Sequence, residues 1–259
     1  MNSHEVEYKL YGDDMQFVEI ELDPRETVVA ESGSMMMMDQ DISMETIFGD
    51  GSKKGGSKLF SSAKRVLTGE SLFMTTFTNN GYQKQKVSFA SPYPGKIIPI
   101  DLTSVAGKLI CQKDAFLCAA KGVSIGIELT KKLGVGFFGG EGFILQKLEG
   151  DGLCFIHAGG TIVKKELRSG EKLKVDTGCL VAMTKDIKYN IEFVGGIKNT
   201  LFGGEGLFFA SLTGPGSVWI QSLPFSRLAS RVFASAPKTY GNNKDEGSIL
   251  GPLSDLFEK

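Results

Sequence analysis

The sequence predicts an all-β chain of three similar units, each a small β-sandwich, with one or two short helices. Three observations carry this prediction: a recurring Gly-Glu motif, alternation of apolar and polar residues, and glycines that separate short apolar runs. The Gly-Glu pair stands at 69–70, 140–141 and 204–205, each time before a run of strand-forming residues. Glycine makes up 33 of the 259 residues, and its placement between apolar runs is typical of tight turns.

The three units span about residues 6–102, 105–167 and 171–224 of a domain that ends near residue 232. Before each motif stands a similar segment that predicts a short strand, a turn, an apolar strand and an alternating strand: "VVAESGSMMMMDQDISMETIF", "LICQKDAFLCAAKGVSIGIEL" and "LKVDTGCLVAMTKDIKYNIEF". Units of this size cannot bury both faces alone, so we expect them to pack around a pseudo-threefold axis or to stack in a row. Closed packing is favoured because neither end resembles a capping repeat.

Strands are indicated most clearly at 123–129, "VSIGIEL", and 189–194, "YNIEFV", where apolar and polar residues alternate. Turn residues follow the strand after each motif: "TNNG" at 78–81, "EGDG" at 149–152 and "TGPG" at 213–216. Such residues between two apolar runs are typical of β-hairpins. We therefore expect one hairpin at the same place in each unit.

Two helices and a tail complete the expected elements. Apolar residues spaced as on one helical face predict a short helix over 59–67, after a glycine-lysine loop at 51–58. A second helix is expected over 224–233, with proline in its first turn. The remainder, 233–259, contains a polar linker and a short apolar peptide, which either docks on the body or binds a partner.

Composition excludes several classes of protein. The formal net charge of −1 provides no general attraction to nucleic acid or to an anionic membrane. The N-terminus lacks the apolar region of a signal peptide, and no apolar run is long enough to span a bilayer. The cysteines are scattered within apolar runs, so we expect reduced core thiols in a cytoplasmic protein: Cys111, Cys118, Cys154 and Cys179.

Few residues offer catalytic or metal-binding chemistry. Only two histidines occur, His4 in a segment expected to be mobile and His157 at the end of an apolar strand. A catalytic histidine needs a nucleophile and an orienting acid, so we interpret His157 as a hydrogen-bonded structural residue. No cysteine or histidine spacing is typical of a metal site, and "GDGSKKGGSK" lacks the spacing of a phosphate-binding loop. We expect no cofactor and no metal.

The recurring glutamates, Glu70, Glu141 and Glu205, are the sharpest candidates for a site. Three carboxylates converging on an axis between units could hold a cation or another ligand. Alternatively, each glutamate accepts backbone hydrogen bonds from its own glycine turn. Both interpretations remain open from the sequence.

Two apolar groups are candidates for an interaction surface. One flanks the motif in the second and third units: Phe137, Phe138, Leu201 and Phe202. The other is the run Met35, Met36, Met37 and Met38. Each group is either core or an exposed face for a protein or a membrane surface. Because successive side chains of a strand point to opposite faces, one methionine pair would lie outward if only one face is buried.

The motifs together resemble a known family. "YGDDMQFVEIELDP", "TGESLFMTTFTNNG", "PYPGKIIPIDL", "FGGEGFILQKLEGDG" and "LFGGEGLFFASLTGPG" occur in the order found in the family named for altered inheritance of mitochondria, and the chain is similar to its prokaryotic branch. The resemblance implies a fold related to the tryptophan RNA-binding attenuation protein, TRAP, a double-stranded β-helix type of sandwich used three times. It implies no established enzymatic activity. Because fold does not imply function, the RNA binding of TRAP is not transferred to this chain.

Two functions are therefore expected from the sequence. The first is a non-catalytic scaffold or interaction protein, which binds a protein partner or a second copy. The alternative is a small-ligand or cation-binding module at the interfaces between units. An enzyme is not expected, since catalysis needs an asymmetric set of acid, base or nucleophile.

Overall fold

The computed structural model describes residues 3–48, 73–131, 143–193 and 208–235. Contacts divide the chain into two compact units, residues 1–228 and 229–259, each of which is described by itself. All of the strands belong to the first unit. The helix expected over 59–67 lies outside the described residues.

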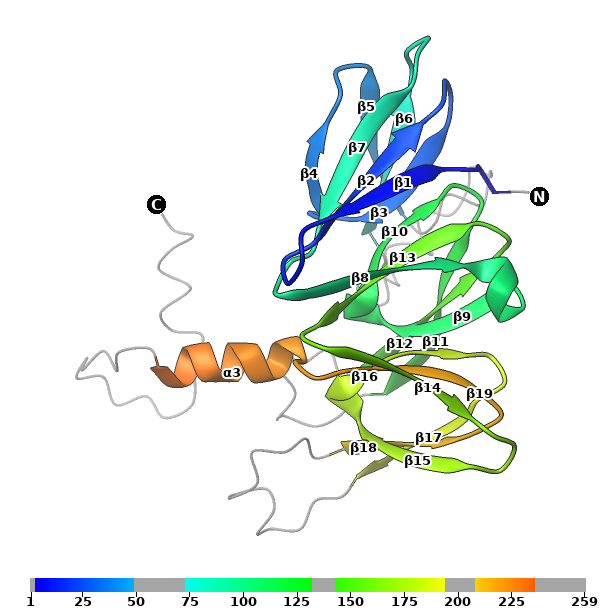
Figure 1. The fold of residues 1–259 in the computed structure, drawn as a ribbon, viewed down its shortest axis with the longest axis vertical. Coiled ribbons are helices and arrows are strands. Elements are labelled where there is room, and N and C mark those ends of the chain that lie inside the picture. Colours follow the sequence, from blue (N-terminus) through cyan, green and yellow to red (C-terminus); the bar gives the residue numbers. More distant parts are fainter. Residues whose placement is uncertain (1–2, 49–72, 132–142, 194–207, 236–259) are drawn as a thin grey trace, which may run out of the picture. The chain divides into compact units, whose positions relative to one another are not determined.

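Within these residues the chain forms nineteen strands in four antiparallel sheets, which confirms the all-β prediction (Figure 1). Sheet A has the order β1 (Glu7–Tyr11), β2 (Phe17–Leu22), β7 (Gln85–Ala90), β4 (Met35–Met38). Sheet B has the order β5 (Ile42–Phe48), β6 (Phe73–Asn79), β3 (Thr27–Glu31), β10 (Phe116–Ala120), β13 (Leu153–Gly159), β8 (Gly95–Asp101).

The other two sheets follow further along the chain. Sheet C has the order β11 (Ser124–Lys131), β12 (Phe143–Glu149), β9 (Lys108–Gln112), β16 (Leu180–Thr184), β19 (Gly216–Gln221), β14 (Ile162–Leu167). Sheet D has the order β15 (Lys172–Asp176), β18 (Phe208–Thr213), β17 (Lys188–Phe193). Three 3-10 turns lie between strands: η1 (Leu102–Val105), η2 (Lys113–Ala115) and η3 (Thr177–Cys179).

The strand orders of sheets B and C follow one rule. Each strand of sheet C carries a number six higher than its counterpart in sheet B, from β5 and β11 at one edge to β8 and β14 at the other. Sheet D, read from β17 to β15, matches the first three strands of this order. In sheet A, β4, β7 and β2 match the last three. The pseudo-threefold axis stays a prediction.

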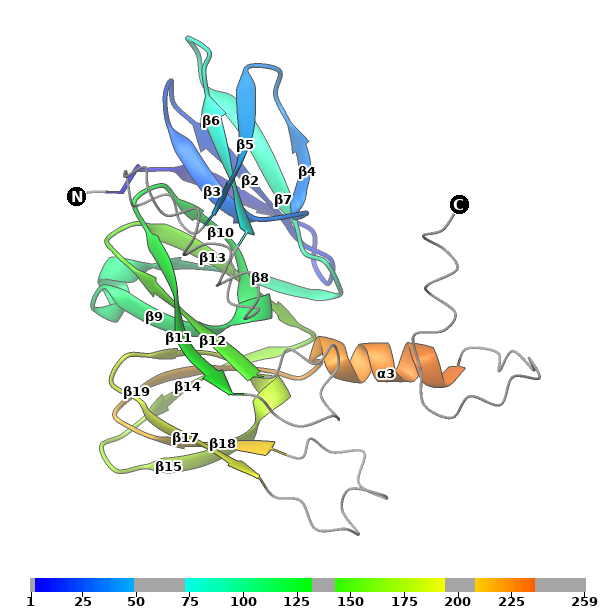
Figure 2. The ribbon, with the colours of Figure 1, turned by 180° about the vertical axis from the view of Figure 1, so that it is seen from behind.

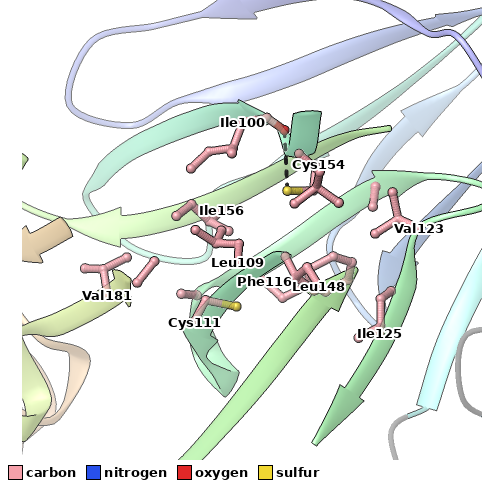
Figure 3. Packing of buried hydrophobic residues seen from close by; sticks show 14 of the residues in the cluster. Ile100, Leu109, Cys111, Phe116, Val123, Ile125, Leu148, Cys154, Ile156 and Val181 are labelled. Carbon is pink, nitrogen blue, oxygen red and sulfur yellow. Dashed lines mark hydrogen bonds between the residues drawn. The ribbon is translucent and has the colours of Figure 1, made fainter. Parts of the chain in front are cut away.

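Three apolar clusters lie between successive sheets. The first joins sheets A and B, with Phe89 on one side and Phe155 on the other. The second joins sheets B and C and includes Phe116 and Trp219, and Figure 3 shows its packing. The third joins sheets C and D around Phe143. Sheets B and C are thus buried on both faces, whereas sheets A and D each contribute one face to a cluster.

The prediction of three hairpins is wrong, because the two strands that flank each turn do not pair with each other. Residues 149–152 join β12 in sheet C to β13 in sheet B, and the turns at 78–81 and 213–216 likewise join strands of different sheets. Strand β12 pairs with β9 and β11, while β13 pairs with β8 and β10. These strands are apolar on both faces, so each is central in its own sheet, and the turn carries the chain across to the next sheet. Figure 2 shows β12 beside β11 and β9 from the opposite side.

The expected C-terminal helix is confirmed as α3 (Phe225–Ser235). It follows Pro224, whose carbonyl oxygen accepts a hydrogen bond of 3.0 Å from the Arg227 N–H. The Arg227 guanidinium lies 3.2 Å from the carboxylate of Asp176 at the end of β15. The first turn of the helix is therefore fixed next to sheet D.

The N-terminal segment is also held in place, contrary to the expectation of mobility for His4. The backbone N–H of His4 donates to the Lys121 carbonyl oxygen at 2.8 Å. Its Nδ1 accepts a hydrogen bond of 2.9 Å from the Thr27 N–H. Residues before β1 thus contact two different parts of the chain, β3 and the turn after β10.

All four cysteines are free thiols, and three of them are buried. Figure 3 shows Cys111 and Cys154 among the side chains between sheets B and C, with a contact of 3.5 Å from the Cys154 thiol to the Ile100 carbonyl oxygen. Burial raises the pKa of Cys154 to about 12, so its thiol stays protonated at neutral pH. Cys179 is half-buried.

Candidate functional site

Strand β4 lies at one edge of sheet A and is held at both ends. Before the strand, the Ser34 hydroxyl donates to the Glu31 carbonyl oxygen at 2.7 Å, and the Ser34 carbonyl oxygen accepts from the Ala90 N–H at 3.0 Å. After it, the Asp39 N–H donates to the Lys86 carbonyl oxygen, and the Asp39 carboxylate accepts from the Lys86 N–H at 2.8 Å. The strand is therefore fixed to β7 although its other side pairs with no described strand.

The side chains of β4 are exposed, unlike those of its counterparts. Met36, Met37 and Met38 are 44%, 47% and 39% exposed, while Met35 packs against the cluster between sheets A and B. We call the three exposed residues the methionine edge. At the same place in sheets B and C, strands β10 and β16 are almost fully buried. The methionine edge is thus an apolar surface at a position that is core elsewhere in the molecule.

A bulge recurs at the start of all three strands. The pairing of β4 with β7 shifts between Met35 and Met37. The pairing of β10 with β13 shifts between Phe116 and Cys118, and that of β16 with β19 between Leu180 and Ala182. Because a bulge inserts one extra residue, it breaks the strict alternation of side chains. Strict alternation therefore does not hold across Met36, and the three methionines after Met35 are all exposed.

The outer face of sheet A beside the methionine edge is charged. The Lys84 ammonium lies 2.7 Å from the Glu7 carboxylate and 2.8 Å from that of Glu21. The Lys86 ammonium lies 2.9 Å from the Glu19 carboxylate. Hydrogen bonds that the ammonium donates to Glu21 and then to Glu7 raise the pKa of Lys84 above its ordinary value. Since the charges alternate and pair, this face carries no patch of a single sign.

Glu31 at the end of β3 is a half-buried carboxyl with a perturbed pKa. Desolvation, reinforced by the nearby Asp114 carboxylate, raises the pKa of Glu31 to about 7, and Lys113 partly opposes the shift. The Glu31 side chain is therefore close to half-protonated at neutral pH. The folded state holds this proton more tightly than the unfolded chain does.

We expect the contribution of Glu31 to the stability of the protein to fall as pH rises from about 4.5 to about 7, whereas the lowered pKa of His157 acts in the opposite direction over much of the same range. A raised pKa of this kind stabilises the folded state fully below the ordinary pKa of 4.5 and loses that contribution as pH rises through the folded value of about 7. Glu31→Gln should therefore be more stable than the wild type at pH 8, by about 1–3 kcal/mol, and equal to it at pH 4.5. Urea unfolding at both pH values measures this.

A matched control for Glu31 is Glu45→Gln, since Glu45 is exposed on β5. This change should leave stability the same at both pH values. Parallel stability curves for the wild type and Glu31→Gln would show that the Glu31 proton is not linked to folding.

His157 lies in the core and not in an open site. Its Nε2 is 3.2 Å from the Tyr93 carbonyl oxygen, and the two rings contact edge to face at a centroid distance of 4.4 Å. Desolvation lowers the pKa of His157 to about 4, so the imidazole is neutral at pH 7. These contacts agree with the structural interpretation of this residue.

A shallow groove of about 360 Å³ lies on sheet D. It is lined by polar and apolar residues of β15, β17 and β18, among them Lys174 and Glu192, whose ammonium and carboxylate lie 3.3 Å apart. Among the residues that the structure describes, no three histidine, cysteine or acidic side chains form a group that could hold a metal ion. Within the same residues, no helix is both long and apolar enough to cross a bilayer.

Comparison with known proteins places the chain in a family. The model of the family described as mitochondrial biogenesis AIM24 matches residues 8–223. The chain belongs to the AIM24 family. An uncharacterised protein of Streptococcus pyogenes serotype M6 is 29% identical over 219 residues, which cover 83% of this chain and 85% of that protein. This AIM24 chain also shares its fold with the crystal structure of another S. pyogenes protein, SPYM3_0169, with a TM-score of 0.72 at 22% identity, over 90% of this chain and all of that one.

The structure describes only some of the site residues that the sequence of this AIM24 protein predicts. The methionines lie together on β4, where the structure exposes three of the four. The glutamates and the apolar residues beside them lie outside the described residues: Glu70, Glu141, Glu205, Phe137, Phe138, Leu201 and Phe202. Their roles stay predictions.

Two features of the AIM24 chain escaped the sequence reasoning. Glu31 ends an apolar strand, and an acid in that place is the only sequence signal of its raised pKa. The exposed lysines of β15, an edge strand among the described residues, have a clearer signal in "KLKVD", where lysine alternates with apolar residues. Such alternation is typical of a strand with one solvated face.

Proposed function

We propose that this AIM24-family chain is a non-catalytic scaffold or interaction protein of the cytoplasm, and that it binds a protein through the methionine edge. The observation that carries the proposal is the exposure of Met36, Met37 and Met38 on an edge strand. Methionine is flexible and polarisable, so it adapts to an apolar partner surface. An edge strand also offers unpaired backbone groups to an incoming strand.

Charge supports a protein partner over nucleic acid or an anionic membrane. The formal net charge is −1, and Lys84 and Lys86 beside the methionine edge are paired with glutamates. Binding of nucleic acid relies on free cationic groups. The buried free thiols, such as Cys111 and Cys118, support a reducing compartment, as expected for the cytoplasm.

The alternative, a ligand or cation site between units, rests on the three motif glutamates outside the described residues. The layers between the described sheets are filled by apolar clusters, which favours structural contact over ligand binding there. We keep the alternative as a prediction.

Photo-crosslinking in the native cell tests the proposed function. A photoreactive amino acid in place of Met37 should yield discrete adducts after irradiation. The matched control is the same amino acid in place of Val163, which is also 47% exposed and also lies on an edge strand, β14. Identical adduct patterns at the two positions, or adducts at neither, would overturn the proposal.

A further inference from the structure

We infer that β4 of one copy pairs with β15 of a second copy, so that chains associate head to tail through a shared sheet. The inference rests on the proposed function and names the partner as another copy of this chain. It begins from the way in which sheets B and C are assembled. Each contains three strands in the order β5-β6-β3 or β11-β12-β9, joined to three in the order β10-β13-β8 or β16-β19-β14.

Sheets A and D are the two halves of such a sheet. Sheet D, β17-β18-β15, has the order of the first half, and in sheet A the strands β4-β7-β2 have the order of the second. The halves join in sheet B through β3 and β10, and in sheet C through β9 and β16. Their counterparts, β15 and β4, are edge strands among the described residues. Pairing them between two copies would complete a sheet of the same order.

The pairing registers agree between the two existing joins. In sheet B, Ala30 lies opposite Cys118 and Val29 opposite Ala119. In sheet C, Cys111 lies opposite Ala182 and Ile110 opposite Met183. The residues of both joins follow the recurring bulge by the same number of positions.

The same correspondence fixes a register for β15 and β4. Val175 is the counterpart of Ala30 and Cys111, because these three occupy the same place in the pairing with β18, β6 and β12. Met37 follows its bulge as Cys118 does. Val175 of one copy therefore lies opposite Met37 of the other, and Lys174 opposite Met38.

Burial at the joins explains the exposed methionines. The residues of β10 and β16 that follow the bulge are buried because they lie beside β3 and β9 in the middle of sheets that are packed on both faces. The same positions of β4 are Met37 and Met38, which are exposed because β4 has no such neighbour in the described chain. A second copy would bring its β15 beside them, together with its own sheet C, which packs on sheet D.

The segment that follows β19 supplies independent support. After β7 and β13 the chain continues into β8 and β14, the outermost strands of the second halves. After β19 it instead forms α3. The place that a further strand would take beside β7 of the next copy is already filled there by β2. Strand β2 of the next copy thus takes the place of the further strand that α3 replaces.

Because β4 and β15 are different surfaces, the contact is heterologous. Such a contact produces a closed ring if the rotation between copies closes and an open filament if it does not. It cannot produce a dimer in which both copies use the same strand.

Mass measurement is the first test. The wild-type chain should sediment at two or more times the monomer mass of 28.0 kDa. The double variant M37K/M38K should shift to the monomer mass while retaining its far-UV circular dichroism and cooperative unfolding. The matched control V163K, on edge strand β14, should keep the wild-type mass. A wild type that is monomeric up to its solubility limit would overturn the inference, as would an unchanged mass for M37K/M38K.

Cysteine cross-linking tests the register. A chain with both M38C and K174C should form a ladder of disulfide-linked species on oxidation, whereas each single variant should remain uncrosslinked. A dimer formed by M38C alone would indicate contact between two β4 strands and overturn the head-to-tail geometry. Failure of these tests together with discrete photo-adducts of other proteins at Met37 would leave the proposed function standing and reject only the second copy as partner.

Discussion

Replacing Cys118 with lysine should unfold the protein, while Met37→Lys should leave it folded. The two residues occupy the same place after the recurring bulge, opposite Phe155 and Ser88. Cys118 is fully buried between sheets A and B, whereas Met37 is on the methionine edge. A lysine at Cys118 would bury an unpaired ammonium group, which costs on the order of 4–5 kcal/mol or more. At Met37 the same side chain stays in water.

Far-UV circular dichroism and urea unfolding measure the difference. Cys118→Val is the control for loss of the thiol, since it keeps an apolar side chain of similar volume and should cost far less. If Cys118→Lys unfolded at the urea concentration of the wild type, β10 would not be the central strand that its pairing indicates.

The elements of this chain were more predictable than their partners. Alternation at 123–129 predicts a strand, and β11 occupies Ser124–Lys131. Proline before an amphipathic segment predicts the last helix, and α3 begins at Phe225. Both signals are local, because they depend on side-chain periodicity and on the fixed backbone angle of proline.

Pairing is not local in this fold, and there the sequence misleads. Asn80-Gly81 is a strong hairpin signal, yet β6 and β7 lie in different sheets. The turn reverses the chain as expected, but each flanking strand pairs with partners far along the sequence, such as β6 with β3. The sequence of a strand that is apolar on both faces does not indicate which strand it will pair with.

The candidate site shows the same limit. The run Met35–Met38 is as apolar as "FLCAA" in β10 and "LVAMT" in β16, and the neighbouring strand and the sheets packed on either face decide which is buried. The raised pKa of Glu31 comes first from burial in the fold and then from Asp114, which is distant in sequence and close in the fold. Neither property can be obtained from local composition.

Gly159→Ala should destabilise the protein by about 3 kcal/mol or more, because no room exists for a Cβ atom at this position. A Cβ on Gly159 would overlap the Leu223 carbonyl oxygen and would lie 2.9 Å from Cε2 of Tyr93. The first neighbour is backbone and cannot rotate away. Leu223 is also hydrogen-bonded to Gly159, since its N–H donates to the Gly159 carbonyl oxygen at 3.2 Å.

The backbone around Gly159 links sheets B and C. Its N–H donates to the Gln221 side-chain oxygen at 2.7 Å, and the amide nitrogen of the same side chain donates to the Gly178 carbonyl oxygen at 2.8 Å. Displacing Leu223 to admit a methyl group would therefore strain the end of β19 as well as that of β13. Loss of one such buried hydrogen bond adds about 1–3 kcal/mol to the cost of the clash.

Gly33→Ala is the comparison variant for backbone strain alone, because φ of Gly159 lies outside the left-handed region. Gly33 has φ of +87° and no atom within 4 Å of the position of a Cβ, so alanine there suffers backbone strain without a clash. That strain costs about 1–2 kcal/mol. Urea unfolding of both variants should place Gly159→Ala clearly below Gly33→Ala in stability. Equal losses would mean that Leu223 can move freely, and that the close contact between β13 and β19 does not hold sheets B and C together.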